Sequence, residues 1–229
     1  MEYAVPDSGR PLAAVRGTTK KFPVRRIYLV GRNYAEHARE MGHDPDREQP
    51  FFFQKPSDAV LPSGNDFPYP PQSDNVHHEI ELVAALGSGG KNILPQDALK
   101  HVYGYAVGVD ITRRDLQQAM KKQGRPWEAG KSFDHSAPMT EIVPVSSDGH
   151  PAASARIWLK VNDELRQDGN LNQLIWSVPE IIAALSESFE LKSGDLIFTG
   201  TPAGVGPISP GDRITGGVDG IGEIEIQVV

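Results

Sequence analysis

The feature that most constrains the fold is the run V-H-H-E-I-E-L-V-A-A-L at residues 76–86, where apolar and polar side chains alternate. Such alternation is typical of a β-strand, whose successive side chains point to opposite faces of a sheet. Glu79 and Glu81 would share one face, and Ile80 and Leu82 would share the other, which needs a core. Because two neighbouring carboxylates repel each other, the acidic face needs a cation, a shared proton or water.

Strands outnumber helices in the rest of the chain. The expected strands are residues 26–32, 51–55, 102–109, 155–162 with the polar segment after it as a hairpin, 194–200 and 223–229. The expected helices are residues 33–42, 95–101, 112–124 and 177–189. Because strands and helices do not alternate regularly, the pattern argues against a doubly wound sheet. We expect a β-rich α+β fold.

Two of the expected helices carry start signals. Ser177 and Glu180 have the spacing of a capping box, and Pro179 lies in the first turn, where its missing N–H does no harm. Thr112 and Asp115 have the same spacing at the start of the helix over residues 112–124. Both segments are therefore expected to begin at their Ser or Thr.

Composition excludes several classes of function. The net charge is −7, and the densest basic run, K-K-F-P-V-R-R at residues 20–26, is too short to predict nucleic-acid binding. No apolar run reaches about 18 residues, so we expect no membrane contact. The chain has no Cys and no visible secretory signal, which makes the cytoplasm the expected location.

A third acid strengthens the case for a metal site. Asp110 closes the apolar run V-Y-G-Y-A-V-G-V, where the end of a core strand is a favoured place for a ligand. Glu79, Glu81 and Asp110 together would suit a hard divalent ion such as Mg²⁺ or Mn²⁺. A hydrated acidic strand face is the alternative. A Zn²⁺ site with His77 and His78 is weaker, since Cys and a helical H-x-x-x-H are absent.

His37 and Glu40 are three residues apart and would share a helix face. A carboxylate beside an imidazole raises its basicity, so this pair could take a proton from water. A surface histidine with an ordinary helical ion-pair partner is the alternative.

Arg114 and Gln117 also have the spacing of one helix face, just after Asp110. The forked donors of arginine suit a planar carboxylate. The alternative is a hydrated amphipathic helix. Lys131, in W-E-A-G-K-S-F-D, stands in an expected loop, where most lysines are simply hydrated.

The segment G-T-P-A-G-V-G at residues 200–206 follows an expected strand. It lacks the G-x-G-x-x-G order, so it does not predict a dinucleotide site. The free backbone N–H groups of this segment and the hydroxyl of Thr201 could hold a small anion. A plain turn is the alternative.

Together these motifs resemble the fumarylacetoacetate hydrolase family. The similar segments, in the family's order, are G-R-N-Y-A-E-H-A-R-E-M, F-F-F-Q-K-P-S, H-H-E-I-E-L, G-Y-A-V-G-V-D-I-T-R-R-D-L-Q, W-E-A-G-K-S-F-D and G-D-L-I-F-T-G-T-P-A-G-V-G. They cover about residues 26–206. The resemblance implies a mixed β-sandwich roll, a homodimer, and a Mg²⁺ or Mn²⁺ site. We expect residues 1–22 to be an N-terminal arm or edge strand and residues 23–229 a single catalytic domain.

Site roles also follow from the resemblance. Matched by motif, Glu79, Glu81 and Asp110 would be the metal ligands. His37 and Glu40 would activate water, on a helix that acts as a lid.

The remaining roles concern the substrate. Lys131 matches the family's active-site lysine, and Arg114 and Gln117 match its substrate-contacting pair. Gly200 and Thr201 match its carboxylate-holding turn.

The chain is similar to the small acylpyruvase branch of the family, because it is too short for the extra N-terminal domain of the long members. The implied reaction is hydrolysis of the carbon–carbon bond of a 3-acylpyruvate, with 3-fumarylpyruvate giving fumarate and pyruvate in aromatic catabolism. Oxaloacetate decarboxylation and isomerisation of a 2-oxo diacid on the same fold are alternatives. A non-catalytic, metal-stabilised binding protein is an alternative from another class.

Overall fold

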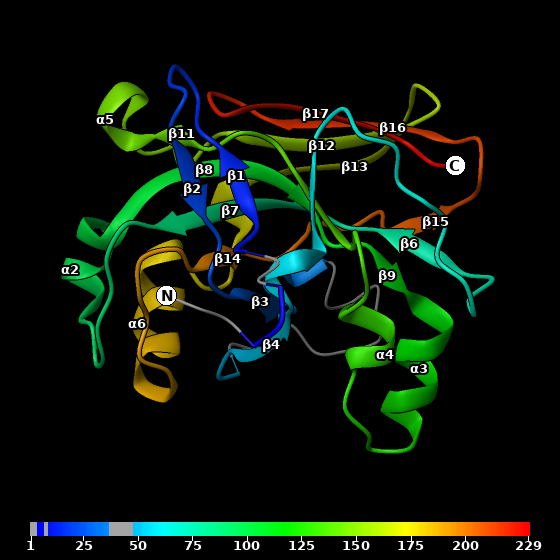
Figure 1. The fold of residues 1–229 in the computed structure, drawn as a ribbon, viewed down its shortest axis with the longest axis horizontal. Helices are drawn as coiled ribbons and strands as arrows, with labels where there is room; N and C mark the ends of the chain where they lie inside the picture. Colours follow the sequence, from blue (N-terminus) through cyan, green and yellow to red (C-terminus); the bar gives the residue numbers. More distant parts are fainter. Residues whose placement is uncertain (1–3, 7–8, 37–47) are drawn as a thin grey trace.

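The computed structural model describes residues 4–6, 9–36 and 48–229, and Figure 1 shows their arrangement. His37 and Glu40, with the rest of the expected helix beyond residue 36, lie outside the described residues. No helix in the described part of the chain is long and apolar enough to cross a membrane.

A mixed sheet of eight strands forms the centre of the molecule. Its members are β3 (Ile27–Gly31), β4 (Phe51–Lys55), β5 (Val60–Pro62), β7 (Ile80–Leu86), β8 (Val102–Val109), β10 (Ala137–Met139), β11 (Val143–Pro144) and β14 (Leu196–Phe198). The order is β4-β3-β14-β7-β8-β10-β5, and β11 also pairs with β8. The pairs β14–β3 and β10–β5 are parallel, and the others are antiparallel.

A second, four-stranded antiparallel sheet covers one face of the first (Figure 1). Its strands are β12 (Arg156–Val161), β13 (Glu164–Asn170), β16 (Arg213–Val218) and β17 (Gly222–Gln227). β12 and β16 contact β7, and β17 contacts β8. The main core fills the interface, with Leu82 and Val107 from one sheet and Leu159 and Ile224 from the other. The expected β-rich α+β class with a mixed β-sandwich is therefore confirmed.

A smaller apolar cluster lies on the opposite face of the central sheet. It joins Val83, Ala85 and Phe198 to Ala13 and Phe22. The last two belong to the antiparallel pair β1 (Leu12–Ala14) and β2 (Lys21–Pro23). The division of the chain at residue 22 stays a prediction.

The helices are short and lie around the sheets. Among the residues that the structure describes, the helices with both ends given are α2 (Pro95–Ala98), α3 (Arg114–Lys122), α4 (Glu128–Lys131), α5 (Val145–Asp148) and α6 (Val178–Ser188), with 3₁₀ turns η1 (Ser57–Ala59), η2 (Leu99–His101) and η3 (Leu171–Gln173). The predicted start of α6 is confirmed, since the Ser177 backbone N–H donates to Glu180 Oε2 over 2.9 Å.

The predicted start of the helix over residues 112–124 is wrong. Thr112 and Arg113 form β9, which joins β6 (Val76–His78) and β15 (Gly206–Ile208) in a three-stranded sheet, and α3 begins at Arg114. Asp115 accepts a 2.7 Å hydrogen bond from Ser73 Oγ, a partner distant in sequence. Strand pairing and this contact outweigh the local capping signal.

Two further expectations need correction. The predicted continuous strand at residues 76–86 is interrupted at Glu79, and its halves β6 and β7 belong to different sheets. Residues Glu128–Lys131, expected in a loop, form α4. The strands predicted at residues 51–55 and 102–109 are confirmed with the same bounds.

Candidate active site

Strand pairing brings the three predicted metal-ligating acids together. β7 and β8 are antiparallel, and Ile80 pairs with Val109. Glu79, just before β7, therefore lies beside Asp110, just after β8, and the Asp110 backbone N–H donates to the Glu79 carbonyl over 2.8 Å. Glu81 lies two residues further along, on the same side of the strand as Glu79. The acidic cluster follows from register rather than from loop geometry.

The three carboxylates are close to one another and buried. One oxygen from each lies within 4.8 Å of the others, and the residues are only 5% (Glu79), 2% (Glu81) and 1% (Asp110) exposed. Burial, together with the negative charges of Asp110 and Glu79, raises the pKa of Glu81 well above its usual value. Three buried like charges are costly, so the cluster requires cations around it.

Lys131 supplies one of these cations. Its Nζ lies 2.8 Å from Glu79 Oε2, 2.6 Å from Asp110 Oδ2 and 2.6 Å from Thr112 Oγ1. These contacts use all three N–H groups of the ammonium. Lys131 ends α4 and is 2% exposed, so the alternative of a hydrated loop lysine is wrong.

Lys55 is a second cation, and it was missed by the sequence analysis. It is fully buried, and its Nζ lies 2.9 Å from Asp110 Oδ1. The Nζ also donates to the carbonyl oxygens of Ile111, over 3.1 Å, and Lys131. Burial lowers the pKa of Lys55 to about 8. The period of two along β4 was an available signal, because it places Phe51, Phe53 and Lys55 on one face.

Arg114 is the third cation, and the structure brings it and Gln117 to the cluster. Arg114 donates to Glu79 Oε1 through Nη2 and to Gln117 Oε1 over 2.7 Å through Nη1. Both side chains are buried, so the alternative of a hydrated helix face is wrong for this pair. The remaining guanidinium nitrogen, Nε, lies 3.5 Å from His77 Nδ1.

His77 borders the cluster without joining it. Its Nε2 lies 2.9 Å from Asn75 Oδ1, and burial together with the positive charge of Arg114 lowers its pKa to about 4. His78 Nδ1 lies 2.9 Å from Gln167 Oε1, away from the acids. Among the described residues, the only group of three or more candidate metal ligands is the acidic one, which gives no support to the Zn²⁺ alternative.

The turn after β14 closes the site from another side. Gly200 has a φ of +99°, which favours glycine, and its N–H donates to Glu81 Oε2 over 2.6 Å. Thr201 is 3% exposed, and its Oγ1 accepts a 2.8 Å hydrogen bond from Gln167 Nε2. Gln167, on β13, was not singled out in the sequence, because a glutamine in a polar hairpin strand carries no local signal of burial.

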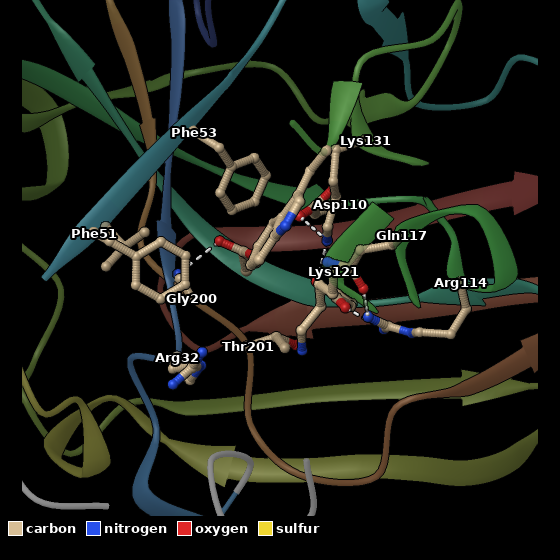
Figure 2. A pocket seen from close by; sticks show the side chains of 15 residues that line it. Arg32, Phe51, Phe53, Asp110, Arg114, Gln117, Lys121, Lys131, Gly200 and Thr201 are labelled. Carbon is tan, nitrogen blue, oxygen red and sulfur yellow. Dashed lines mark hydrogen bonds and ion pairs between the residues drawn. The ribbon is translucent and has the colours of Figure 1, made fainter. Parts of the chain in front are cut away.

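The three acids line one pocket together with Lys131, Arg114 and the turn after β14 (Figure 2). Its floor contains the acidic cluster and Lys131, and aromatic rings form part of its wall. The lining residues are Val30, Gly31, Arg32, Phe51, Phe53, Glu79, Glu81, Asp110, Arg114, Gln117, Lys121, Trp127, Lys131, Gly200 and Thr201. His37 and Glu40 lie outside the described residues, so the water-activating pair stays a prediction.

The acidic cluster has the chemistry of a divalent cation site. All three candidate ligands offer carboxylate oxygens, which Mg²⁺ and Mn²⁺ prefer. Asp110 Oδ1 is buried and accepts no well-directed hydrogen bond within the described residues, although it is ion-paired with Lys55. An additional positive charge would satisfy this oxygen and offset the repulsion that raises the Glu81 pKa. The residues present therefore fit such an ion.

Comparison with known proteins agrees with the resemblance that the sequence motifs indicate. The model of the domain described as fumarylacetoacetate (FAA) hydrolase C-terminal matches residues 26–229. The oxaloacetate tautomerase FAHD1 of Mus musculus, a mitochondrial protein, is 44% identical over 204 residues, which are 89% of this chain and 91% of that protein. A fumarylpyruvate hydrolase of a Ralstonia species is 44% identical over 190 residues, which are 82% of this chain and 98% of that protein.

A solved structure is similar over the whole length. The crystal structure of fumarylpyruvate hydrolase from Pseudomonas aeruginosa, in complex with Mn²⁺ and pyruvate, has a TM-score of 0.97 and 52% sequence identity. The similarity covers 100% of this chain and 99% of that one.

Proposed function

Because the chain belongs to the fumarylacetoacetate hydrolase family, we propose that it is a metal-dependent hydrolase of 3-acylpyruvates, with 3-fumarylpyruvate as its substrate. The products would be fumarate and pyruvate. The observation that carries this proposal is the convergence of Glu79, Glu81 and Asp110 on one buried point of a pocket that also contains Lys131.

Glu79, Glu81 and Asp110 would hold Mg²⁺ or Mn²⁺. When bound, the cation would supply a Lewis acid that polarises the 2-oxo group of the substrate. Lys55 and Lys131 hold the two oxygens of Asp110 in place, and Arg114 and Lys131 do the same for Glu79. Such outer contacts orient the ligands of a metal site.

The overall reaction consumes one water. Its oxygen joins the acyl carbonyl carbon, and the bond from that carbon to the neighbouring CH₂ breaks. The electron pair goes to the CH₂ carbon, which takes up a proton and becomes the methyl group of pyruvate. His37, oriented by Glu40, would remove a proton from the water. Lys131 Nζ, which contacts both Glu79 and Asp110, would supply a proton or stabilise the developing negative charge.

Polar groups on two sides of the pocket would position the substrate. Arg114 keeps two N–H groups beyond those that contact Glu79, Gln117 and His77, so it can still donate to a ligand. Thr201 Oγ1 already accepts a hydrogen bond from Gln167, which leaves its hydroxyl proton to donate. Gly200 lies in the same turn, and its N–H already donates to Glu81 Oε2.

A second candidate function is favoured by one of the relatives. The similarity to oxaloacetate tautomerase FAHD1 supports action on oxaloacetate, as a tautomerase or as the decarboxylase or isomerase considered from the sequence. These reactions need no activated water. They therefore depend less on His37 than hydrolysis does. A non-catalytic binding protein would show metal-dependent stability without turnover.

The test is an assay of metal-free protein after addition of Mg²⁺ or Mn²⁺. The loss of enol absorbance is followed with 3-fumarylpyruvate, acetylpyruvate and oxaloacetate, and the products are identified. We expect 3-fumarylpyruvate to be split, and His37→Ala to lower its turnover by about 100-fold or more. His101→Ala, in η2, is the matched control and should change little. Turnover of oxaloacetate alone would refute the hydrolase proposal.

A homodimer, a cytoplasmic location and a role in aromatic catabolism also remain part of the proposal. They rest on the family resemblance and on the chain's composition.

A further inference from the structure

Two cationic side chains in the pocket form no ion pair with the three acids. Arg32, after β3, and Lys121, near the end of α3, line the same pocket as the three acids. Neither forms an ion pair with a carboxylate or a side-chain hydrogen bond within residues 9–36 and 48–229. Lys131, in contrast, has all three N–H groups committed to the protein. Arg32 and Lys121 are therefore positive charges available to a ligand.

A pair of aromatic rings holds these two cations at the pocket wall. Arg32 Cζ lies 5.2 Å from the centre of the Phe51 ring, and Lys121 Nζ lies 5.7 Å from the centre of the Trp127 ring. The two rings touch edge to face, with centroids 5.5 Å apart and an interplanar angle of 88°. One cation thus lies over each ring of a packed pair. Figure 2 shows Arg32 across the pocket from Asp110 and Lys131, with Lys121 between them.

The backbone at Arg32 has an unusual conformation. Arg32 has a φ of +56°, which is uncommon for a residue with a β-carbon, and such conformations cluster at functional sites. A β-carbon at Gly31 would lie 2.0 Å from Phe51 Cζ, so only glycine lets the Phe51 ring cover this position. The next residue, Asn33, is held in place by its own side chain, because its Nδ2 donates to the Trp176 and Thr199 carbonyls over 2.8 and 2.7 Å.

The local electrostatics are those of an anion site. Burial, and the positive charges of Arg32, Arg114 and Lys131, lower the pKa of Lys121. Arg114 and Lys131 are balanced by Glu79 and Asp110, whereas the positive charge at Arg32 and Lys121 is balanced by no described carboxylate. A carboxylate bound between them would relieve this repulsion.

Building on the proposed function, we propose that Arg32 and Lys121 bind the carboxylate at the far end of the substrate's acyl group. The 2-oxo acid end would lie at the acidic cluster, and the far carboxylate would lie at the Phe51–Trp127 rings. This subsite selects acylpyruvates whose acyl group ends in a carboxylate over those whose acyl group ends in a methyl group.

The test measures binding separately from turnover. The ligands are 2-oxoheptanedioate and 2-oxoheptanoate, which have the chain length of 3-fumarylpyruvate and lack the second carbonyl group that hydrolysis requires. They differ only in the far carboxylate. Calorimetric titration of the Mn²⁺-loaded protein should give a dissociation constant for the diacid at least about tenfold lower than that for the monoacid.

Variants assign this preference to the two cations. Lys121→Gln and Arg32→Gln should each remove most of the diacid preference and leave the monoacid affinity within about threefold. Lys121→Arg keeps the charge and should retain the preference. Lys122→Gln is the matched control, because Lys122 is exposed, neighbours Lys121 on α3 and does not line the pocket. Thermal unfolding of each variant checks that the fold is intact.

The outcomes separate the two proposals. If Lys121→Gln and Arg32→Gln weaken both ligands equally, or leave the preference unchanged, the subsite is wrong even where the wild type hydrolyses 3-fumarylpyruvate. Failure of the wild type to bind either ligand also overturns it. If the preference is found and lost as expected while no acylpyruvate is hydrolysed, the subsite holds and the proposed reaction fails.

Discussion

Lys55 Nζ lies 2.9 Å from Asp110 Oδ1, and the two side chains are 0% and 1% exposed. Lys131 contacts the other oxygen of the same carboxylate. Asp110 is therefore held between two lysines that come from β4 and α4. Because buried charges are tolerated only when paired, this arrangement makes Lys55 both a structural cation and a support for a proposed metal ligand.

Replacement of Lys55 by Met should destabilise the protein by about 3–5 kcal/mol, because it leaves Asp110 with one cation fewer in a buried site. The free energy of unfolding from urea denaturation measures the loss. Lys100→Met is the matched control, since the Lys100–Asp97 ion pair is exposed and should contribute less than about 1 kcal/mol. A change at Lys55 no larger than that of the control would contradict the structural role given to this lysine.

Glu81 should make the stability of the metal-free protein depend on pH. Its pKa is raised above the usual value of 4.5, so between that value and the higher folded-state pKa the folded protein binds more protons than the unfolded chain. Stability contributed by this group is present at low pH and is lost as the pH rises. Denaturation in EDTA should therefore show Glu81→Gln gaining stability relative to the wild type as the pH rises from about 4.5.

The matched control for this effect is Glu187→Gln, at an exposed position of α6. Its stability relative to the wild type should not follow the same trend. A flat difference between wild type and Glu81→Gln over the whole pH range would show that Glu81 is not the titrating group.

Replacement of Gln167 by Glu should destabilise the fold by about 2 kcal/mol or more and raise the KM for substrate. Gln167 Oε1 accepts from the Ile80 N–H over 3.1 Å, so it is the carbonyl oxygen, and Nε2 donates to Thr201 Oγ1 and to the Pro202 carbonyl, each over 2.8 Å. A carboxylate in this place would repel the Pro202 carbonyl and compete for the Thr201 proton. Gln96→Glu, at an exposed position, is the matched control. Unchanged stability and KM would remove Gln167 from the site's support.

Replacement of Ser177 by Ala should cost about 1 kcal/mol, because it removes a partner in the capping box that begins α6. Ser188→Ala, at the exposed end of the same helix, should stay within about 0.5 kcal/mol of the wild type. Chemical denaturation of the two variants makes the comparison, and equal costs would show that the box does not stabilise the helix start.

The parts of the fold that depend on local pattern could be predicted from sequence. The apolar run of β8 and the aromatic run of β4 fix both strands with their bounds, and the capping box fixes the start of α6. Thr112 misled the prediction, because its pairing in β9 depends on β6, a strand distant in sequence. The residues next to Thr112 in the sequence cannot predict its pairing with β6.

The same limit applies to the site. The alternation around Glu79 and Glu81, with Asp110 at a strand end, predicts an acidic cluster that the structure brings together. The alternation along β4 places Lys55 on the same face as Phe51 and Phe53, whereas the polar strand of Gln167 carries no such signal. Neither strand identifies the partner of its side chain, because only the packing of distant segments places Lys55 at Asp110 and Gln167 at Thr201. Their roles could not be predicted without the tertiary structure.

The central claim is that Glu79, Glu81 and Asp110 hold a divalent cation. The most direct measurement is anomalous X-ray scattering from crystals of the protein soaked in Mn²⁺. The account predicts one strong anomalous peak at about 2.0–2.3 Å from a carboxylate oxygen of each of the three residues, and loss of that peak in Glu79→Gln and Glu81→Gln crystals. A cluster without a peak in fully soaked wild-type crystals, or a peak bound by other residues, would contradict it.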